Sequence, residues 1–197
     1  MLTKLRKSQK LISAIKNFAR NNAEVWDVIA YGSAVRGKED ARDVDLAIIL
    51  SKKTGVDRKL SLAQGLKESL EKFFSSIDVK AIDIDDLFDA NFLARQGIIA
   101  EGYRLIKKQS LAQSIGFRTF VFIKYSLKRL TYAQKKMLYY ALKGRRGSKG
   151  VLETVGGELI SRELLKIPIE ASYTLEELLR MHKVSFTSES AMVYKKR

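Results

Sequence analysis

The feature that most constrains the fold is a pair of predicted strands joined through a glycine-serine corner. Residues 25–31 form a short apolar run with β-branched and aromatic side chains, which predicts a buried strand that ends at Gly32. Residues 43–50 place an apolar side chain at every second position, which predicts a second strand with one wholly apolar face. Because Gly32 and Ser33 are small, backbone N–H groups at this corner can approach an anion closely. The sequence therefore predicts an anion-binding turn at the end of the first strand.

Three carboxylates are expected beside this corner. Asp43 and Asp45 share the second face of the second predicted strand, where residues two apart lie about 6.5 to 7 Å from each other at Cα. Residues 77–82 predict a third strand that turns Asp78 away from its apolar side chains. If this strand pairs beside the second, the three carboxylates meet. Their hard oxygen atoms suit Mg²⁺, and a phosphate-binding turn beside such a site points to phosphoryl or nucleotidyl transfer.

These residues resemble the DNA polymerase β nucleotidyltransferase superfamily, and within it the minimal nucleotidyltransferase branch. The resemblance rests on the corner, on the Arg36-Gly37 that follows it, on the segment Asp43-Val44-Asp45-Leu46 and on a lone aspartate in a later strand. It covers about residues 1–108. It implies an α/β (α+β) fold, in which a polymerase beta-like sheet is flanked by helices.

The resemblance also implies roles for these residues. Gly32, Ser33 and Arg36 would bind the triphosphate of an NTP, for which we expect ATP. Asp43 and Asp45 would bind two Mg²⁺ ions, with Mn²⁺ as the alternative metal.

Asp78 would complete this metal and catalytic site and help to activate the attacking hydroxyl. Asp83 is a rival for that third place. Arg42 stands where the family often has serine, so the nucleotide preference stays open. Carboxylates favour the first turn of a helix, so we expect Asp83, Asp85, Asp86 and Asp89 to cap the helix that follows.

Composition excludes several other classes of protein. The chain has no cysteine and a single histidine, which rules out disulfides, cysteine-type zinc sites and histidine-based metal sites. No apolar run reaches the roughly 18 residues of a membrane span, and residues 1–22 carry charges where a signal peptide would be apolar. We therefore expect a cytoplasmic protein that does not enter a membrane.

Charge divides the chain into two unequal halves. Residues 1–106 hold 18 Lys and Arg against 15 Asp and Glu, whereas residues 107–197 hold 19 against 7. No acidic residue occurs between Glu101 and Glu153, while thirteen basic residues do. A long stretch of one sign predicts a partner of the opposite sign, and we expect RNA or another polyanion.

The pattern of residues predicts two domains, a nucleotidyltransferase domain at 1–108 and a small basic α+β domain at 109–197. In the first, residues 2–22 and 58–74 have the apolar spacing of helices that cover a sheet. In the second, we expect helices at 110–129 and 132–142. A strand at 164–169, a helix at 175–181 and a strand at 184–194 follow, and Pro168 predicts that its strand is an edge strand or ends there.

A basic loop, residues 143–150, joins the two parts of the predicted second domain. It combines three glycines with Lys143, Arg145, Arg146 and Lys149, which we predict to bind nucleic acid. A solvated loop between helices explains the pattern equally well. Tyr125, Tyr132, Tyr139 and Tyr140 lie among the basic residues and could stack on nucleobases, although aromatic side chains at such spacing are more often part of a core.

The leading hypothesis is a Mg²⁺-dependent nucleotidyltransferase that moves NMP from an NTP to an acceptor hydroxyl, with RNA as the expected acceptor. The first alternative keeps the chemistry and changes the acceptor to a protein or a small molecule. The second alternative is a non-catalytic nucleic-acid-binding or regulatory module on the same scaffold, because a fold does not imply a function.

Overall fold

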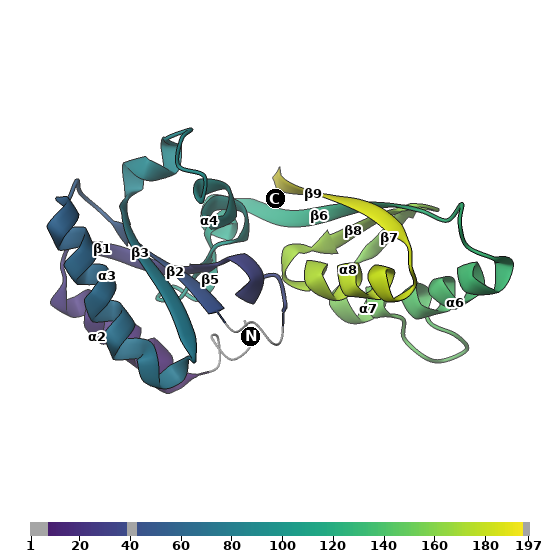
Figure 1. Cartoon of the computed structure of the whole chain (residues 1–197), viewed down its shortest axis with the longest axis horizontal. Coiled ribbons are helices and arrows are strands. Elements are labelled where there is room, and N and C mark those ends of the chain that lie inside the picture. The colour runs from purple at the N-terminus through teal and green to yellow at the C-terminus, as the bar shows by residue number, and fades with distance from the viewer. Residues whose placement is uncertain (1–7, 39–42, 195–197) are drawn as a thin grey trace. The chain divides into compact units, whose positions relative to one another are not determined.

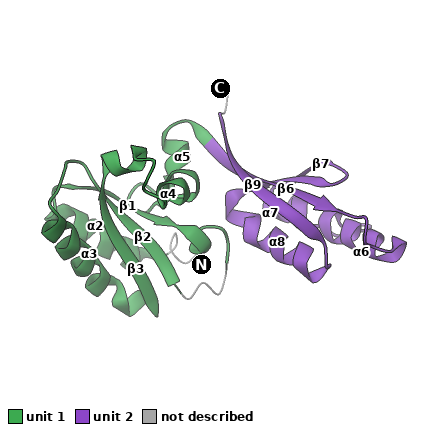
Figure 2. Cartoon of the chain, turned by 45° about the horizontal axis from the view of Figure 1, so that its top comes forward, with its two compact units in different colours: residues 1–117 green, residues 118–197 purple. Residues whose placement is uncertain are grey.

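Two separate β-sheets organise the protein in the computed structural model, which describes residues 8–38 and 43–194 (Figure 1). Each sheet belongs to one compact unit. The first unit spans residues 1–117 and the second unit spans residues 118–197 (Figure 2). This boundary lies later in the chain than the predicted 108/109, because strand β5 and helix α5 still belong to the first unit. The assignment of a separate function to each part stays a prediction.

The first unit contains a mixed five-stranded sheet with the order β3-β2-β1-β4-β5. Strands β2 and β3 are parallel and are connected through helix α3, as a parallel pair requires, whereas the other neighbours are antiparallel. The three strands expected from the sequence are confirmed. The strands are β1 (Val25–Tyr31), β2 (Asp43–Leu50), β3 (Ser76–Asp83), β4 (Tyr103–Arg104) and β5 (Gln109–Ser110).

Helices cover both faces of this sheet. Helices α2 (Gln9–Asn21) and α3 (Val56–Leu70) pack on one face, where Ile15 and Leu66 are fully buried against apolar strand residues. Helices α4 (Arg95–Glu101) and α5 (Leu111–Ser114) pack on the other face. The helix expected after the acidic cluster is α4, which begins at Arg95.

Short 3-10 helices link these elements of the first unit. They are η1 (Gly32–Ala34), η2 (Glu71–Phe73) and η3 (Ile84–Phe88). Asp83 caps η3 in a reciprocal arrangement with Asp86. The α-helix that follows, α4, begins after Ala94 with no side-chain cap, so the predicted capping holds for two of the four aspartates and on a 3-10 helix only.

The second unit contains a four-stranded sheet with the order β7-β8-β6-β9. Its core lies on one face, between the sheet and three helices, and includes Ile123, Leu138 and Leu175. The helices are α6 (Tyr132–Lys143), α7 (Val151–Val155) and α8 (Ser172–Met181), and a short 3-10 helix η4 (Ile169–Ala171) precedes α8. The strands are β6 (Phe117–Ser126), β7 (Glu158–Ser161), β8 (Leu164–Pro168) and β9 (Ser185–Tyr194).

The helix predicted at residues 110–129 is wrong for most of its length. Helix α5 ends at Ser114, and strand β6 occupies residues 117–126. The side chains of β6 alternate between a buried and a more exposed face, but phenylalanines at 120 and 122 lie on the more exposed face. These apolar residues hide the period of two that identifies a strand, and the apolar and basic residues three and four apart then resemble a helix.

The other predicted elements of the second unit are confirmed. Helix α6 begins after Thr131, whose side chain accepts a hydrogen bond from the Gln134 N–H. Strand, helix and strand then follow as β8, α8 and β9. Strand β8 lies inside the sheet and ends at Pro168, so the second of the two predicted possibilities is the one observed.

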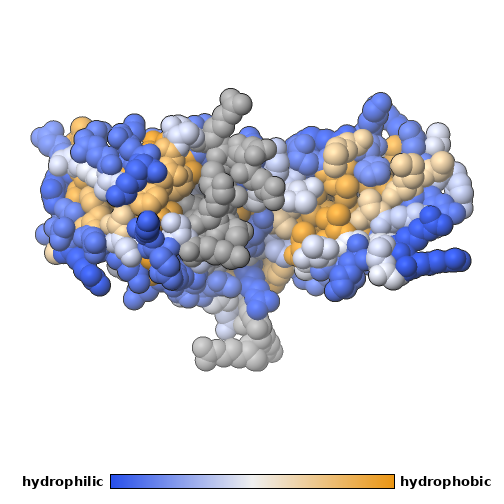
Figure 3. All heavy atoms as spheres, turned by 90° about the horizontal axis from the view of Figure 1, so that it is seen from below, coloured by the Kyte–Doolittle hydropathy of each residue, from blue (hydrophilic) through white to orange (hydrophobic). Residues whose placement is uncertain are grey.

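Polar side chains form much of the surface of both units. In the space-filling view of Figure 3, hydrophilic residues surround smaller apolar areas on each side of the picture. Among residues 8–38 and 43–194, no helix combines the length and the apolar character that crossing a membrane requires.

Candidate functional site

The glycine-serine corner lies directly beside the first residues of strand β2. Strand β1 ends at Tyr31, which pairs with Asp45 across the antiparallel ladder, and Gly32 then starts the 3-10 helix η1 with a φ of +72°. A Cβ atom at position 32 would lie 2.7 Å from Oδ2 of Asp45. Glycine is therefore required twice here, by the left-handed backbone and by the carboxylate that contacts it.

The parallel pairing of β2 and β3 brings the predicted carboxylates to one part of the sheet. Asp45 and Asp78 are partners in the register, and Asp43 lies two residues before Asp45 on the same face of β2. Asp43 and Asp78 are exposed, while Asp45 is half-buried. We call Asp43, Asp45 and Asp78 the carboxylate cluster.

The negative charge of this cluster is visible in the ionisation of its members and neighbours. Burial raises the pKa of Asp45, and the charges of Asp78 and Asp43 raise it further against the opposing effect of Lys80. Burial and the charges of Asp45 and Asp78 raise the pKa of Tyr31 to about 12. In both residues burial is the larger cause, and the charges of the carboxylates act in the same direction.

The donor set of the cluster fits a hard divalent cation. Carboxylate oxygens are the ligands that Mg²⁺ prefers, and a cation would relieve the repulsion that raises the pKa of Asp45. Within the described residues, however, no three Asp, Glu, His or Cys side chains are close enough together to hold a metal ion. Lys80 Nζ lies 3.5 Å from Oδ2 of Asp78 and pairs with it. The assignment of metal ligands to Asp43, Asp45 and Asp78 stays a prediction.

Asp83, the rival for the third place, lies at the other end of the paired strands. It is opposite Leu50 in the register, whereas Asp78 is opposite Asp45. Its carboxylate is 2.8 Å from Lys59 Nζ and caps η3, so its interactions are structural. Arg42 lies outside the described residues.

Glu101 is a further residue at the corner, which the sequence patterns did not predict. It ends helix α4, and its carboxylate oxygen lies 3.7 Å from Arg36 Nε. Burial raises the pKa of Glu101, while Arg36 and a backbone hydrogen bond from Gly32 lower it. Two groups predicted to bind phosphate, the Gly32 N–H and the Arg36 side chain, thus both interact with a carboxylate of this chain. The sequence feature that could have drawn attention to Glu101 is its position as the last acidic residue before the long basic stretch.

The basic loop is a closed turn between α6 and α7. The Arg145 N–H donates to Ser148 Oγ, and this hydroxyl donates to the Arg145 carbonyl oxygen. Lys149 forms an ion pair with Glu153 at 2.9 Å, and the Arg145 guanidinium lies 5.3 Å from the centre of the Tyr140 ring. Part of the positive charge of the loop is therefore engaged within the protein, and the predicted contacts to nucleic acid stay a prediction.

Comparison with known proteins identifies similarity in the first unit. Residues 13–110 match the family model described as "Polymerase beta, Nucleotidyltransferase". This range includes the corner, the carboxylate cluster and Glu101. No curated protein sequence matches the chain.

Several solved structures resemble the chain over about half of its length. A toxin-antitoxin solved with AMP-PNP has 23% identity and a TM-score of 0.37, over 48% of this chain and 71% of that chain. A Shewanella oneidensis structure has 17% identity and a TM-score of 0.36, over 50% and 71%. A tri-AMPylated Shewanella oneidensis HEPN toxin in complex with MNT antitoxin has 19% identity and a TM-score of 0.35, over 58% and 77%.

Proposed function

Because residues 13–110 form a nucleotidyltransferase domain of the polymerase beta family, we propose that the protein moves NMP from an NTP, with ATP favoured, to a hydroxyl group of RNA. The oxygen of the acceptor hydroxyl would form a bond to the α-phosphorus and give its proton to the Asp78 carboxylate, while the bond between that phosphorus and the bridging oxygen to the β-phosphate breaks. Pyrophosphate would then leave. The observation that supports this proposal most is the closeness of Gly32 to Asp45: a Cβ atom at position 32 would lie 2.7 Å from Oδ2 of Asp45, so the corner predicted to bind phosphate lies against a carboxylate predicted to bind metal.

Residues of the corner would bind the triphosphate. The Ser33 hydroxyl and the backbone N–H groups of η1 are small donors, and the half-exposed Arg36 guanidinium offers a fork-shaped set of donors that suits phosphate oxygens. To take this role, Arg36 and the Gly32 N–H would exchange the Glu101 carboxylate for the phosphate.

The carboxylate cluster would hold the metal and orient the acceptor. Asp43 and Asp45 are the proposed metal ligands, because they share one face of β2 and because the charges of Asp43 and Asp78 already act on Asp45. Mg²⁺ bound there would neutralise charge on the triphosphate. Asp78 is exposed, so its carboxylate would accept a hydrogen bond from the attacking hydroxyl and aim that oxygen at the nucleotide.

The test is transfer of label from each α-labelled NTP to RNA, with and without Mg²⁺, in the wild type and in the double variant Asp43→Asn/Asp45→Asn. These substitutions keep the shape of the side chains and relieve the repulsion, so the fold should be retained. Loss of a supporting partner of a metal ligand costs about 10- to 100-fold, so loss of two ligands should exceed about 100-fold. Asp85→Asn is the matched control, because Asp85 is an exposed aspartate of η3, which follows the far end of β3.

Transfer that survives the double substitution would refute the proposed site. Transfer to added protein, or to small hydroxyl compounds, in place of RNA would keep the site and replace the acceptor. RNA binding combined with no binding of nucleotide in a calorimetric titration would support the non-catalytic module.

A further inference from the structure

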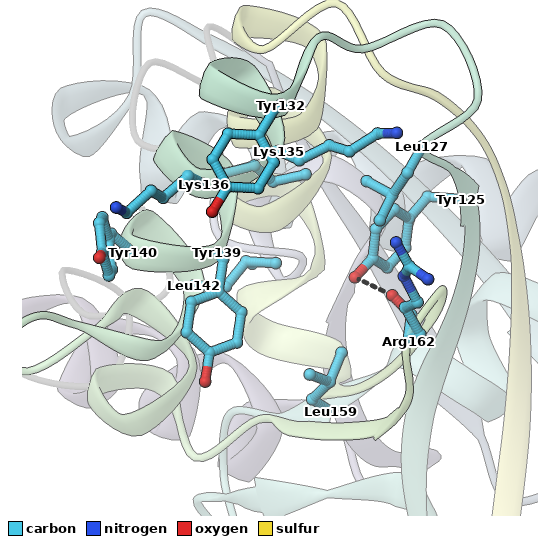
Figure 4. A pocket seen from close by; sticks show the side chains of 11 residues that line it. Tyr125, Leu127, Tyr132, Lys135, Lys136, Tyr139, Tyr140, Leu142, Leu159 and Arg162 are labelled. Atoms are coloured by element: carbon cyan, nitrogen blue, oxygen red, sulfur yellow. Dashed lines mark hydrogen bonds between the residues drawn. The ribbon is translucent and has the colours of Figure 1, made fainter.

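A pocket of about 390 Å³ opens in the second unit, between helix α6, the end of strand β6 and the turn that joins β7 to β8 (Figure 4). This volume falls within the range of about 300–1,000 Å³ typical of sites for small molecules. Its lining is mostly apolar and includes four tyrosines, with three basic side chains among them. We call it the tyrosine pocket.

Helix α6 supplies one wall. Tyr132, Lys135, Lys136 and Tyr139 recur at intervals of three and four residues, so they lie on one side of the helix. The rings of Tyr132 and Tyr139 are not core side chains, because these residues are 81% and 54% exposed. An aromatic face that stays open to solvent can stack on a flat ligand.

The opposite wall is held in place by a hydrogen bond. Tyr125 is buried at the end of β6, and its hydroxyl donates to the carbonyl oxygen of Arg162 at 2.9 Å (Figure 4). This bond connects the end of β6 to the turn between β7 and β8, and the Arg162 side chain extends toward the pocket. The wall is therefore preformed, and only the α6 side carries exposed rings.

The positive charges around the pocket have no carboxylate partners in the described part of the chain. Within it, Lys135, Lys136 and Arg162 form no ion pair, whereas Lys149 and Lys166 pair with glutamates. Glu163 lies next to Arg162 in sequence, but its carboxylate accepts the Leu127 N–H at 2.7 Å. Unpaired cations beside open aromatic rings fit a ligand that is both flat and anionic, which describes a nucleotide.

Two cations share the Tyr140 ring at the border between the tyrosine pocket and the basic loop. Lys136 Nζ lies 5.8 Å from the centre of the Tyr140 ring, and the Arg145 guanidinium lies 5.3 Å from the same ring. This series leads from the tyrosine pocket into the basic loop. A polymer with repeated phosphates would engage both, and a free mononucleotide would engage only one.

We infer that the tyrosine pocket binds an unpaired base of single-stranded RNA. The base stacks on Tyr132 or Tyr139, and the phosphates on either side contact Lys135, Lys136 and Arg162. This inference deepens the proposed function by naming the residues that hold the acceptor. It rests on residues of the second unit alone, so it holds or fails independently of the transfer chemistry.

The test is fluorescence anisotropy of a labelled single-stranded RNA of about ten nucleotides, within the usual site sizes of about 4–16 nucleotides. The full-length chain carries Asp43→Asn/Asp45→Asn, so that transfer cannot alter the RNA. Tyr139→Ala should weaken binding about 5- to 150-fold, which corresponds to the loss of one base-aromatic stack. Tyr139→Phe keeps the ring and should bind as the parent does. Lys135→Gln/Lys136→Gln should reduce the salt slope by about 1.4, the value for two lost phosphate contacts to a single strand.

Lys124→Gln is the charge-matched control. Lys124 precedes Tyr125 in β6, so its side chain lies on the other face of the sheet and is exposed. The inference predicts a much smaller effect for Lys124→Gln than for the single variant Lys135→Gln, which also removes one positive charge.

Three results would overturn the inference. The first is unchanged affinity in Tyr139→Ala. The second is an equal loss in Lys124→Gln, which would move binding to the open face of the sheet. The third is competition by AMP with an affinity equal to that of the RNA, which would make the pocket a site for free nucleotides. A further experiment separates this inference from the proposed function. Tyr139→Ala is placed in a chain with an intact carboxylate cluster, and loss of RNA binding with retained label transfer to another acceptor would show that the two activities depend on different residues.

Discussion

The substitution Asp27→Ala should unfold the first unit at a markedly lower denaturant concentration. Asp27 is fully buried in β1, and its Oδ2 lies 2.7 Å from Nε of Arg104 in β4. Its Oδ1 accepts hydrogen bonds from the N–H groups of Val28 at 2.9 Å and Ile106 at 3.3 Å. One carboxylate therefore satisfies a guanidinium and two backbone donors between neighbouring strands.

The expected magnitude follows from what the substitution leaves behind. Arg104 cannot lose its proton, and only 9% of its side chain is exposed, so its charge would stay buried without a partner. Breaking a buried ion pair from one side costs about 3–5 kcal/mol. The two N–H groups that lose an acceptor add to this cost. We therefore expect the free energy of unfolding to fall by about 4 kcal/mol.

Glu24→Ala is the matched control, because the Glu24–Arg58 pair has the same N–O distance of 2.7 Å but involves an arginine that is 48% exposed. Exposed pairs contribute about 0–1 kcal/mol. Urea unfolding followed by fluorescence of Trp26, the only tryptophan of the chain, reports on the first unit. The variants are compared by the urea concentration at the midpoint of unfolding. The fluorescence intensity itself is not compared, because Arg104 lies 4.2 Å from the centre of the Trp26 ring and its movement would change that intensity. A cost of Asp27→Ala within about 1 kcal/mol of the Glu24→Ala cost would refute the reasoning from burial.

Three further predictions concern the candidate site. Gly32→Ala should lower the free energy of unfolding by about 1–2 kcal/mol because the backbone φ at this position is +72°. It should also reduce transfer about 100-fold, because the new methyl group would displace the Asp45 carboxylate. Gly55→Ala is the control in both assays, because a Cβ atom at position 55 would meet no heavy atom within 4 Å beyond its immediate chain neighbours. Glu101→Gln should tighten binding of an ATP analogue in a calorimetric titration, because it removes a negative charge beside Gly32; unchanged affinity would contradict this. Burial raises the pKa of Glu101 above its ordinary 4.5, so the folded state holds this proton more tightly than the unfolded state. The contribution of Glu101 to stability should thus fall as the pH rises from 4.5 through the raised pKa, and Glu101→Gln should flatten that part of the curve; an unchanged curve would show that the carboxyl is not desolvated.

The arrangement of the first unit could be predicted because its signals are local. The alternation in residues 43–50 identifies a strand and places Asp43 and Asp45 on one face. A helix between two strands favours a parallel pair, and that pair brings Asp78 into register with Asp45. A local sequence pattern does not show which partner the end of a side chain turns toward. The pairing of Asp78 with Lys80, and the turn of Glu101 toward Arg36, depend on contacts between elements far apart in the chain.

The second unit shows the opposite case. Strand β6 was predicted as a helix because two phenylalanines interrupt the polar face of its alternation. The tyrosine pocket could not be found either, since its walls come from α6 and from the turn between β7 and β8, which meet only in the folded unit. The sequence did contain the ingredients, namely tyrosines among basic residues with no acidic residue near them. Whether such tyrosines are core or surface depends on packing, and here Tyr125 is buried while Tyr132 is exposed.

The position of Glu101 changes how nucleotide binding at the corner should be understood. The Gly32 N–H has one proton to donate, and it already donates to the Glu101 carboxylate, which also pairs with Arg36. A phosphate that uses the same donors must therefore replace a carboxylate, so the affinity measures the difference between two anions at one place. Burial opposes the charged form of Glu101, and release of its carboxylate to water would recover that cost. Protonation of Glu101 removes this competing anion, as Glu101→Gln does, so nucleotide affinity should strengthen as the carboxyl becomes protonated; an affinity that does not change would show that the exchange is not the binding step.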